Sequence, residues 1–157
     1  MWSFELSYLE FLLPIGISFY VFMAISYIID VYTQKIKAER NPGIVALFLS
    51  FFPHLVAGPI MRGDELIPQF YKTHPFEAQK VSNGLKLIIW GLFKKVVIAD
   101  RLALYVDLVY QNPANFDGLT LSVATIFFAF QIYCDFSGYC DIAIGCAQIL
   151  GYDLTDN

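Results

Sequence analysis

Two aspartates lie in an otherwise apolar stretch of the sequence. The stretch reads FQIYCDFSGYCDIAIG, from Phe130 to Gly145, and it contains Asp135 and Asp141. A carboxylate in such surroundings is costly to bury unless it has a cation, a hydrogen-bond donor or water beside it. Two interpretations follow. The aspartates either pair with lysines or arginines of neighbouring helices, which holds a helix bundle together, or they line a path for a substrate.

A single unbroken helix through this stretch would place its polar residues on one side. At about 100° per residue, an arc of about 160° contains Gln131, Asp135, Ser137, Gly138, Asp141, Gly145 and Gln148, with Cys134, Ile142 and Ile149 among them. We expect this side to face protein or water. The alternative is a helix broken at Ser137-Gly138.

The histidines give weaker signals. His54 lies in FFPHLVAGPIMR between two prolines, and it is either a hydrogen-bonded structural residue, a cavity-lining residue or a catalytic base. His74 stands beside Pro75 in a polar stretch, and no H-x-x-x-H pair occurs. The G-x-S-x-G elbow, the P-loop and the G-x-G-x-x-G motif are also missing from the sequence, so serine-hydrolase, nucleotide-binding and dinucleotide-binding functions lack support.

The three cysteines do not predict a metal site. Cys134, Cys140 and Cys146 recur every six residues, which on a helix separates successive side chains by about 120° and prevents three thiolates from meeting at one ion. We expect small apolar side chains in a buried setting and no bound metal.

The composition places the whole chain in a membrane. Hydrophobic residues make up 57% and charged residues 15% of the 157 residues, and the mean hydropathy is +0.57. Soluble domains have about 45–50% apolar and about 25% charged residues. The length allows three to five passes at about 20 residues each. The net charge of -4, with no lysine or arginine run, excludes nucleic acid as a partner.

The first half of the chain predicts one span and one interrupted segment. Phe11 to Ile29 is uncharged and long enough to cross the hydrocarbon core. The basic loop after it indicates that the N-terminus lies outside and the loop lies in the cytoplasm. Gly43 to Met61 is also uncharged, but it contains Pro53 and Pro59 and has basic loops on both sides. We therefore predict a re-entrant or broken segment that returns to the cytoplasmic side.

The second half predicts two helical regions joined by an outside turn. Val81 to Tyr110 has a helical pattern but six charged residues, so we expect partly interfacial helices there. A turn without basic residues follows near Asn112-Pro113, and Leu119 to Cys134 opens a long last helix that continues to about residue 150. The prediction is an all-α membrane protein with multi-pass transmembrane helices, and one membrane domain over residues 1–157.

Four segments of the chain resemble one known family. LPIGISFYVFMAISYIIDVY, FFPHLVAGPIMR, GLFKKVVIADRLA and FQIYCDFSGYCDIAIG are similar, in this order, to segments of the membrane-bound O-acyltransferases. The alginate O-acetyltransferase membrane subunits form the nearest branch, and the D-alanyl transferases of teichoic acids are more distant. The resemblance implies an inner-membrane enzyme that transfers acetyl or another short acyl group to an exported polysaccharide.

The resemblance also implies substrates and partners. The acyl donor is acyl-CoA or an acyl carrier, no cofactor is bound, and extracytoplasmic acetyltransferase proteins and membrane lipid are the expected partners. The family's catalytic histidine belongs to a later tryptophan-histidine motif. Here the only tryptophans are Trp2 and Trp90, and neither is directly followed by a histidine. Many relatives have glutamine at the position of His54. We therefore expect no catalytic residue in this chain.

The expected contribution of this chain is part of a tunnel wall, and we expect the sequence to be a fragment truncated at the C-terminus and at the N-terminus. The candidate tunnel-lining residues are His54, Gln131, Asp135, Ser137 and Asp141. Two alternatives stay open. In a transporter or channel module, the interrupted segment and the two aspartates would bind a permeating solute. In a non-catalytic membrane scaffold, the chain would hold a partner enzyme.

Overall fold

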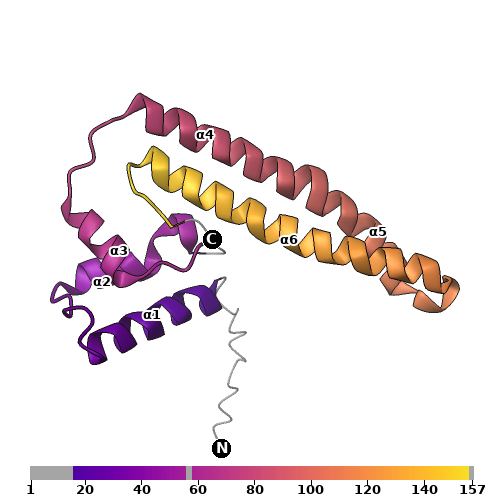
Figure 1. The fold of residues 1–157 in the computed structure, drawn as a ribbon, viewed down its shortest axis with the longest axis horizontal. Coiled ribbons are helices and arrows are strands. Elements are labelled where there is room, and N and C mark those ends of the chain that lie inside the picture. Colours follow the sequence, from indigo (N-terminus) through magenta and orange to yellow (C-terminus); the bar gives the residue numbers. More distant parts are fainter. Residues whose placement is uncertain (1–15, 56–57, 156–157) are drawn as a thin grey trace, which may run out of the picture.

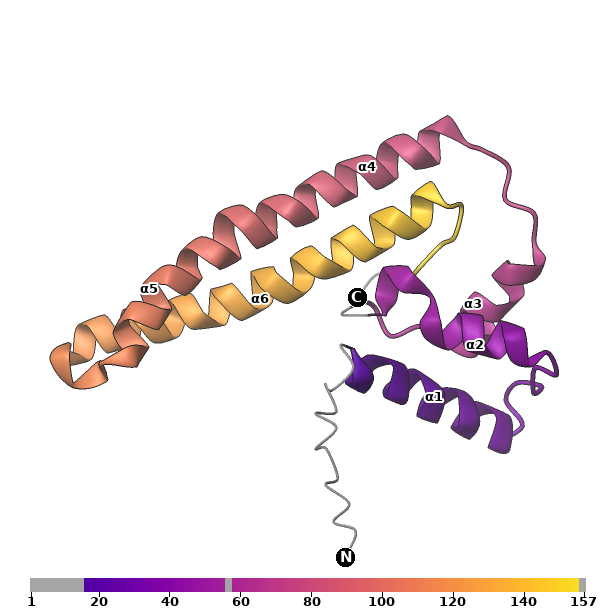
Figure 2. The same cartoon turned by 180° about the vertical axis from the view of Figure 1, so that it is seen from behind.

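The computed structural model describes residues 16–55 and 58–155, and all regular secondary structure in these two ranges is helical. The all-α prediction is therefore confirmed for this part of the chain. Two long antiparallel helical segments lie side by side, and the shorter helices α1 to α3 gather at one end of them (Figure 1). Seen from behind, α4 and α6 again run side by side, with α1, α2 and α3 near the end where α4 begins (Figure 2).

Helix α6 (Gly118–Ile149) is the longest element, with 32 residues. It begins at Asp117, whose carboxylate accepts a hydrogen bond from the Thr120 backbone N–H at 3.2 Å, as an N-cap should. No proline follows Pro113, so nothing interrupts the helix. It ends before Gly151, which has a left-handed φ of 89°. The predicted last helix is thus continuous, and the alternative break at Ser137-Gly138 is wrong.

Its partner is a second continuous helical segment made of three parts. Helix α4 (Ala78–Leu92) passes into the π-helical segment η3 (Phe93–Ala99), which passes into α5 (Asp100–Gln111). The short 3-10 turn η4 (Pro113–Asn115) leads to α6. We call residues 78–149 the helical hairpin. The helical pattern of this region was predicted from the sequence, but the π-helical segment was not.

Glycines bring the two long segments of the hairpin into close contact. Gly84 faces Gly145, and Gly91 faces Gly138, so that two glycines seven residues apart on each segment meet in antiparallel order. A Cβ atom on Gly84 would lie 2.6 Å from the Gly145 carbonyl oxygen. Only glycine permits backbones to approach this closely.

The short helices form a separate core against the C-terminal half of α6. Helices α1 (Ile17–Tyr32), α2 (Pro42–Ser50) and α3 (Gly63–Leu66), with the 3-10 turns η1 (Phe52–His54) and η2 (Ile67–Tyr71), surround this core. The fully or nearly fully buried side chains are Met23, Phe48, Phe51, Met61, Leu66, Ile67, Ile144, Ala147 and Leu154.

The segment predicted to be re-entrant or broken is not one helix. Helix α2 ends at Ser50, three residues before Pro53, and the 3-10 turn η1 follows it. The chain leaves the α-helix at Phe51, whose ψ of 109° is extended, and Pro53 has no backbone N–H with which to continue the α-helical hydrogen bonds. Residues 56–57 lie outside the described ranges, as do residues 11–15 of the first predicted span. The return of the segment to the same side of a membrane stays a prediction.

The apolar surface of the molecule is large. Helix α6 is long and apolar enough to cross a membrane, and α1 is a shorter apolar helix. Large apolar side chains stand exposed along α1, α4 and α6, among them Phe22, Ile28, Ile89, Trp90, Ile126, Ile132 and Tyr133. A soluble monomer rarely exposes so much contiguous apolar surface, so these faces need lipid or protein against them. The extent of the single membrane domain and the interfacial placement of residues 81–110 stay predictions.

Candidate functional site in the helical hairpin

The first of two charge clusters in the hairpin centres on Lys94 of η3. Its Nζ atom lies 2.5 Å from an Asp141 carboxylate oxygen and donates a hydrogen bond to Ser137 Oγ at 2.6 Å. The exposed fractions of the Lys94 and Asp141 side chains are only 12% and 20%. We call these three residues the closed cluster. Each charge has its partner within it.

The second cluster centres on Lys95, the next residue. Its Nζ atom lies 2.7 Å from a carboxylate oxygen of Asp135 on α6 and 2.7 Å from one of Asp100 at the start of α5. The side chains are more exposed here, at 38% for Lys95, 48% for Asp100 and 52% for Asp135. We call these three residues the open triad. It contains one ammonium group and two carboxylates.

The backbone explains how consecutive lysines reach different carboxylates. Asp135 and Asp141 are separated by about 120° around α6, so the two carboxylates lie on different flanks of the helix. Both lysines lie close to Gly138 of α6. A Cβ atom on Gly138 would come within 3.2 Å of the Lys95 backbone nitrogen and 3.3 Å of Lys94 Cβ. The absence of a side chain at Gly138 thus admits η3 against α6. Single π-helical turns inside long helices are frequent at functional sites.

The ion pairs are set in apolar surroundings near the middle of the hairpin. Bringing charges out of water costs several kcal/mol per ion, and only close geometry with additional hydrogen bonds offsets that cost. The closed cluster meets this condition through Ser137. The arrangement therefore holds the two long segments together at a fixed register.

Known proteins give similar sequences over almost the whole chain. The chain is 45% identical to the probable alginate O-acetylase AlgI of Pseudomonas putida over 149 residues, which is 93% of this chain and 30% of the relative. It is 33% identical to the peptidoglycan O-acetyltransferase of Helicobacter pylori, with all of this chain and 35% of the relative covered. The chain is a homologue of membrane-bound O-acyltransferases.

A more distant relative is the teichoic acid D-alanyltransferase of Bacillus subtilis, at 24% identity over 91% of this chain and 37% of the relative. The family resemblance found in the four sequence segments is thereby confirmed. No model of a protein family matches the chain. The chain spans about 30% of the length of the alginate O-acetylases that it matches.

The structure of this acyltransferase homologue brings together three of the five candidate residues. Asp135, Ser137 and Asp141 all contact the lysines of η3, so the prediction that both aspartates pair with cations of a neighbouring helix is confirmed. Gln131 lies one turn before Asp135, and its amide oxygen is buried without a hydrogen-bond partner. The side chain of His54 lies outside the described part of the structure. The tunnel-lining role of these residues stays a prediction.

Sequence reasoning missed the partners of the aspartates. In the sequence, Lys94 and Lys95 were used only as evidence that Val81 to Tyr110 does not face lipid throughout. The signal that could have found them is the matching glycine spacing, Gly84 to Gly91 and Gly138 to Gly145. This spacing fixes an antiparallel register in which the lysines lie opposite the aspartates.

A second polar region lies at the end of the hairpin where α1 to α3 gather. The ring nitrogen Nε2 of His74 lies 2.8 Å from the Gln69 carbonyl oxygen, and the ring packs against Tyr152 with centroids 4.4 Å apart. The Gln69 amide accepts from the Asp153 backbone N–H and donates to the Asp153 carbonyl, both at 2.9 Å. These contacts fasten the segment after α6 to η2.

A cavity of about 390 Å³ lies beside this region and is lined by Glu65, Gln69, Lys72, Thr73, His74, Pro75, Glu77, Lys80, Gly151 and Asp153. Its charges are mixed, and His74 is engaged in packing and hydrogen bonding. In the ranges 16–55 and 58–155, no three side chains of histidine, cysteine, aspartate or glutamate are grouped so that they could hold a metal ion. Cys134 and Cys140 are buried, as expected for small apolar side chains, whereas Cys146 is only partly buried.

Proposed function

We propose that the protein to which this chain belongs is a membrane-bound O-acyltransferase that transfers acetyl or another short acyl group to hydroxyl groups of an exported polysaccharide. The observation that carries the proposal is the similarity, at 45% and 33% identity, to proteins named for O-acetylation of alginate and of peptidoglycan. The similarity covers 93% of this chain for the first and all of it, the whole hairpin included, for the second.

The part played by this chain is structural support for the acyl path. The hairpin presents apolar side chains outward, and the ion pairs Lys94–Asp141 and Lys95–Asp135 join its two segments near the middle, as a wall inside a bilayer requires. The glycine contacts and the closed cluster fix the register of that wall. The candidate residues for the surface along the path are His54, Gln131, Asp135, Ser137 and Asp141. The catalytic histidine lies elsewhere in the protein.

The acyl donor in this proposal is acyl-CoA or an acyl carrier on the cytoplasmic side. The acceptor is a polysaccharide outside the inner membrane, and extracytoplasmic acetyltransferase proteins assist the transfer. The basic loops around Lys37 and Lys72 support a cytoplasmic position for that end of the molecule. The support for the donor and the partners comes from the family resemblance.

The test uses the full-length protein in the cells that make it. Polysaccharide is isolated from the wild-type strain, from a deletion strain and from strains with single substitutions, and its O-acyl content is measured by NMR. We expect the deletion to abolish O-acylation and Lys94→Met to lower it at least tenfold, because the wall loses its register. Asp107→Asn, which removes an exposed carboxylate outside both clusters, is the matched control and should keep wild-type content. Unchanged O-acylation in the deletion strain would contradict the proposal.

A further inference from the structure

We propose that the flank of the hairpin formed by the open triad is the contact surface for a further membrane-embedded helix, and that this helix places an arginine or lysine side chain between Asp100 and Asp135. The inference rests on the proposed function in one respect, since it takes the hairpin to lie in a bilayer. It goes further by naming the surface and the chemistry of what covers it.

The two charge clusters differ in net charge. The closed cluster is neutral, because Lys94 faces the single carboxylate of Asp141. The open triad has one ammonium group against two carboxylates, which leaves one net negative charge. Arg101 follows Asp100 but makes no ion pair with any other residue in the described ranges. The triad therefore lacks one cation.

Asp135 is half exposed although it lies near the middle of α6. Asp135 has 17 residues of α6 before it and 14 after it, so it stands near the middle of a helix about 48 Å long at 1.5 Å per residue. The hydrocarbon core is about 30 Å thick, which keeps headgroups and bulk water far from this position. About half of the Asp135 side chain is nevertheless uncovered. A charged side chain that is half exposed at this depth faces protein or a water-filled cavity, because contact with lipid is too costly.

The neighbours on the same flank favour a helix over a wet cavity. At 100° per residue, Phe128 and Ile132 lie within about 60° of Asp135 on α6, and their exposed fractions are 39% and 53%. Water would leave these apolar side chains uncovered, whereas a packed helix would bury them. A guanidinium group offers five donors in a planar fork, which suits several acceptors together.

The experiment introduces a photoreactive side chain on this flank. In the full-length protein in its native membrane, Ile132 is replaced by p-benzoyl-phenylalanine, the membranes are irradiated, and mass spectrometry identifies what the probe has joined. We expect a protein adduct whose attachment point lies within one helical turn of an arginine or lysine. The Asp100→Asn, Asp135→Asn double substitution should lower the adduct yield severalfold, and Asp107→Asn should leave the yield unchanged.

Three results would overturn the inference: adducts to phospholipid only, no protein adduct at all, or a protein adduct whose yield is the same in the double variant. Polysaccharide O-acylation is measured for the same strains, so that the two proposals fail separately. The predicted adduct in a protein without acyl transfer would leave the helix contact standing and remove the proposed function. Lipid adducts in an active enzyme would do the reverse.

Discussion

At the scale of single residues, the burial of the Lys94 and Asp141 side chains determines how much stability the protein loses when either one is substituted. Lys94→Met leaves the Asp141 carboxylate four-fifths buried beside apolar groups with no cation. Removing one partner of a buried ion pair costs about 3–5 kcal/mol, because the remaining charge is uncompensated. We expect the thermal unfolding midpoint of the purified protein, followed by circular dichroism in detergent, to fall by several degrees.

The double substitution Lys94→Met, Asp141→Leu serves as the control for this prediction. It removes both charges and fills the space with apolar atoms, and such replacements are often neutral or stabilising. Its unfolding midpoint should recover most of the loss. A double variant as unstable as Lys94→Met alone would show that the pair is not the source of the effect.

Asp117 gives a prediction about pH. Hydrogen bonds from the Thr120 hydroxyl and backbone N–H hold the pKa of Asp117 below its ordinary value of 3.8. Because the pKa is lower in the folded state, the carboxylate's contribution to helix stability is fully present above the unfolded value and is lost as the pH falls through the folded one. Hydrogen-exchange protection of the Thr120 and Leu121 amides should therefore be constant above about pH 5 and decline below pH 3.8.

Asp117→Asn is the matched variant, because asparagine also caps a helix but has no charge to titrate. Its protection should not change over the same pH range. An equal decline in both proteins would assign the pH dependence to another group.

The free-energy cost of burying a charge was the basis for predicting the contacts of single residues. That cost indicated that Asp135 and Asp141 need partners, and the structure supplies lysines. It could not indicate which lysines, because the choice depends on the register between residues 40 or more positions apart in the sequence. For the same reason, the contact of His74 with the distant Tyr152 had no sequence signal.

At the scale of elements, the hairpin depends on glycines that let its two segments touch. In Gly91→Ala, the new Cβ atom would collide with the Gly138 carbonyl oxygen, which is backbone and cannot rotate away. Forcing extra atoms into such packing costs about 1–3 kcal/mol. We expect a lower unfolding midpoint and, because Gly138 also admits η3, faster hydrogen exchange across residues 93–99.

Gly118→Ala is the control for the glycine prediction. A Cβ atom there would meet nothing within 4 Å, so the midpoint should stay within error of wild type. If Gly91→Ala were as stable as Gly118→Ala, close backbone contact would not be what holds the hairpin together.

The helices themselves were predictable because their signals are local. Asp117-Gly118 and the absence of later prolines mark a long helix, and Pro53 marks a break. The π-helical segment η3 was not predictable, because the residues Phe93–Ala99 have no local feature that demands it. Its cause lies across the hairpin, at Gly138 and at the carboxylates of α6.

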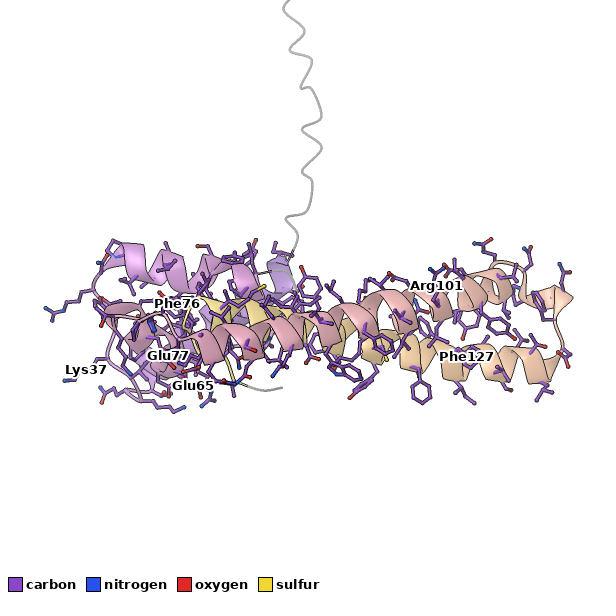
Figure 3. The ribbon with its side chains drawn as sticks, turned by 90° about the horizontal axis from the view of Figure 1, so that it is seen from above. Lys37, Glu65, Phe76, Glu77, Arg101 and Phe127 are labelled. Carbon is purple, nitrogen blue, oxygen red and sulfur yellow. The ribbon has the colours of Figure 1, made fainter. Side chains whose placement is uncertain are left out.

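At the scale of the whole molecule, the two ends differ in charge. The loops that follow α1 and η2 lie at the same end of the hairpin, and the turn between α5 and α6 lies at the other (Figure 1). Lys37 and Glu77 mark the first end, and Arg101 and Phe127 lie toward the second (Figure 3). No lysine or arginine occurs after Arg101 in the sequence. From the positive-inside rule we predict that the first end lies in the cytoplasm.

Impermeant maleimide labelling tests this arrangement most directly. Single cysteines replace Lys37, Lys72 and Asn115 in a background without Cys134, Cys140 and Cys146, and intact cells are compared with opened cells. We predict labelling of position 115 in intact cells and of positions 37 and 72 only after the cells are opened, because the segment between those two returns to its starting side and the hairpin crosses the membrane. Labelling of position 72 but not of 37 in intact cells would contradict the account.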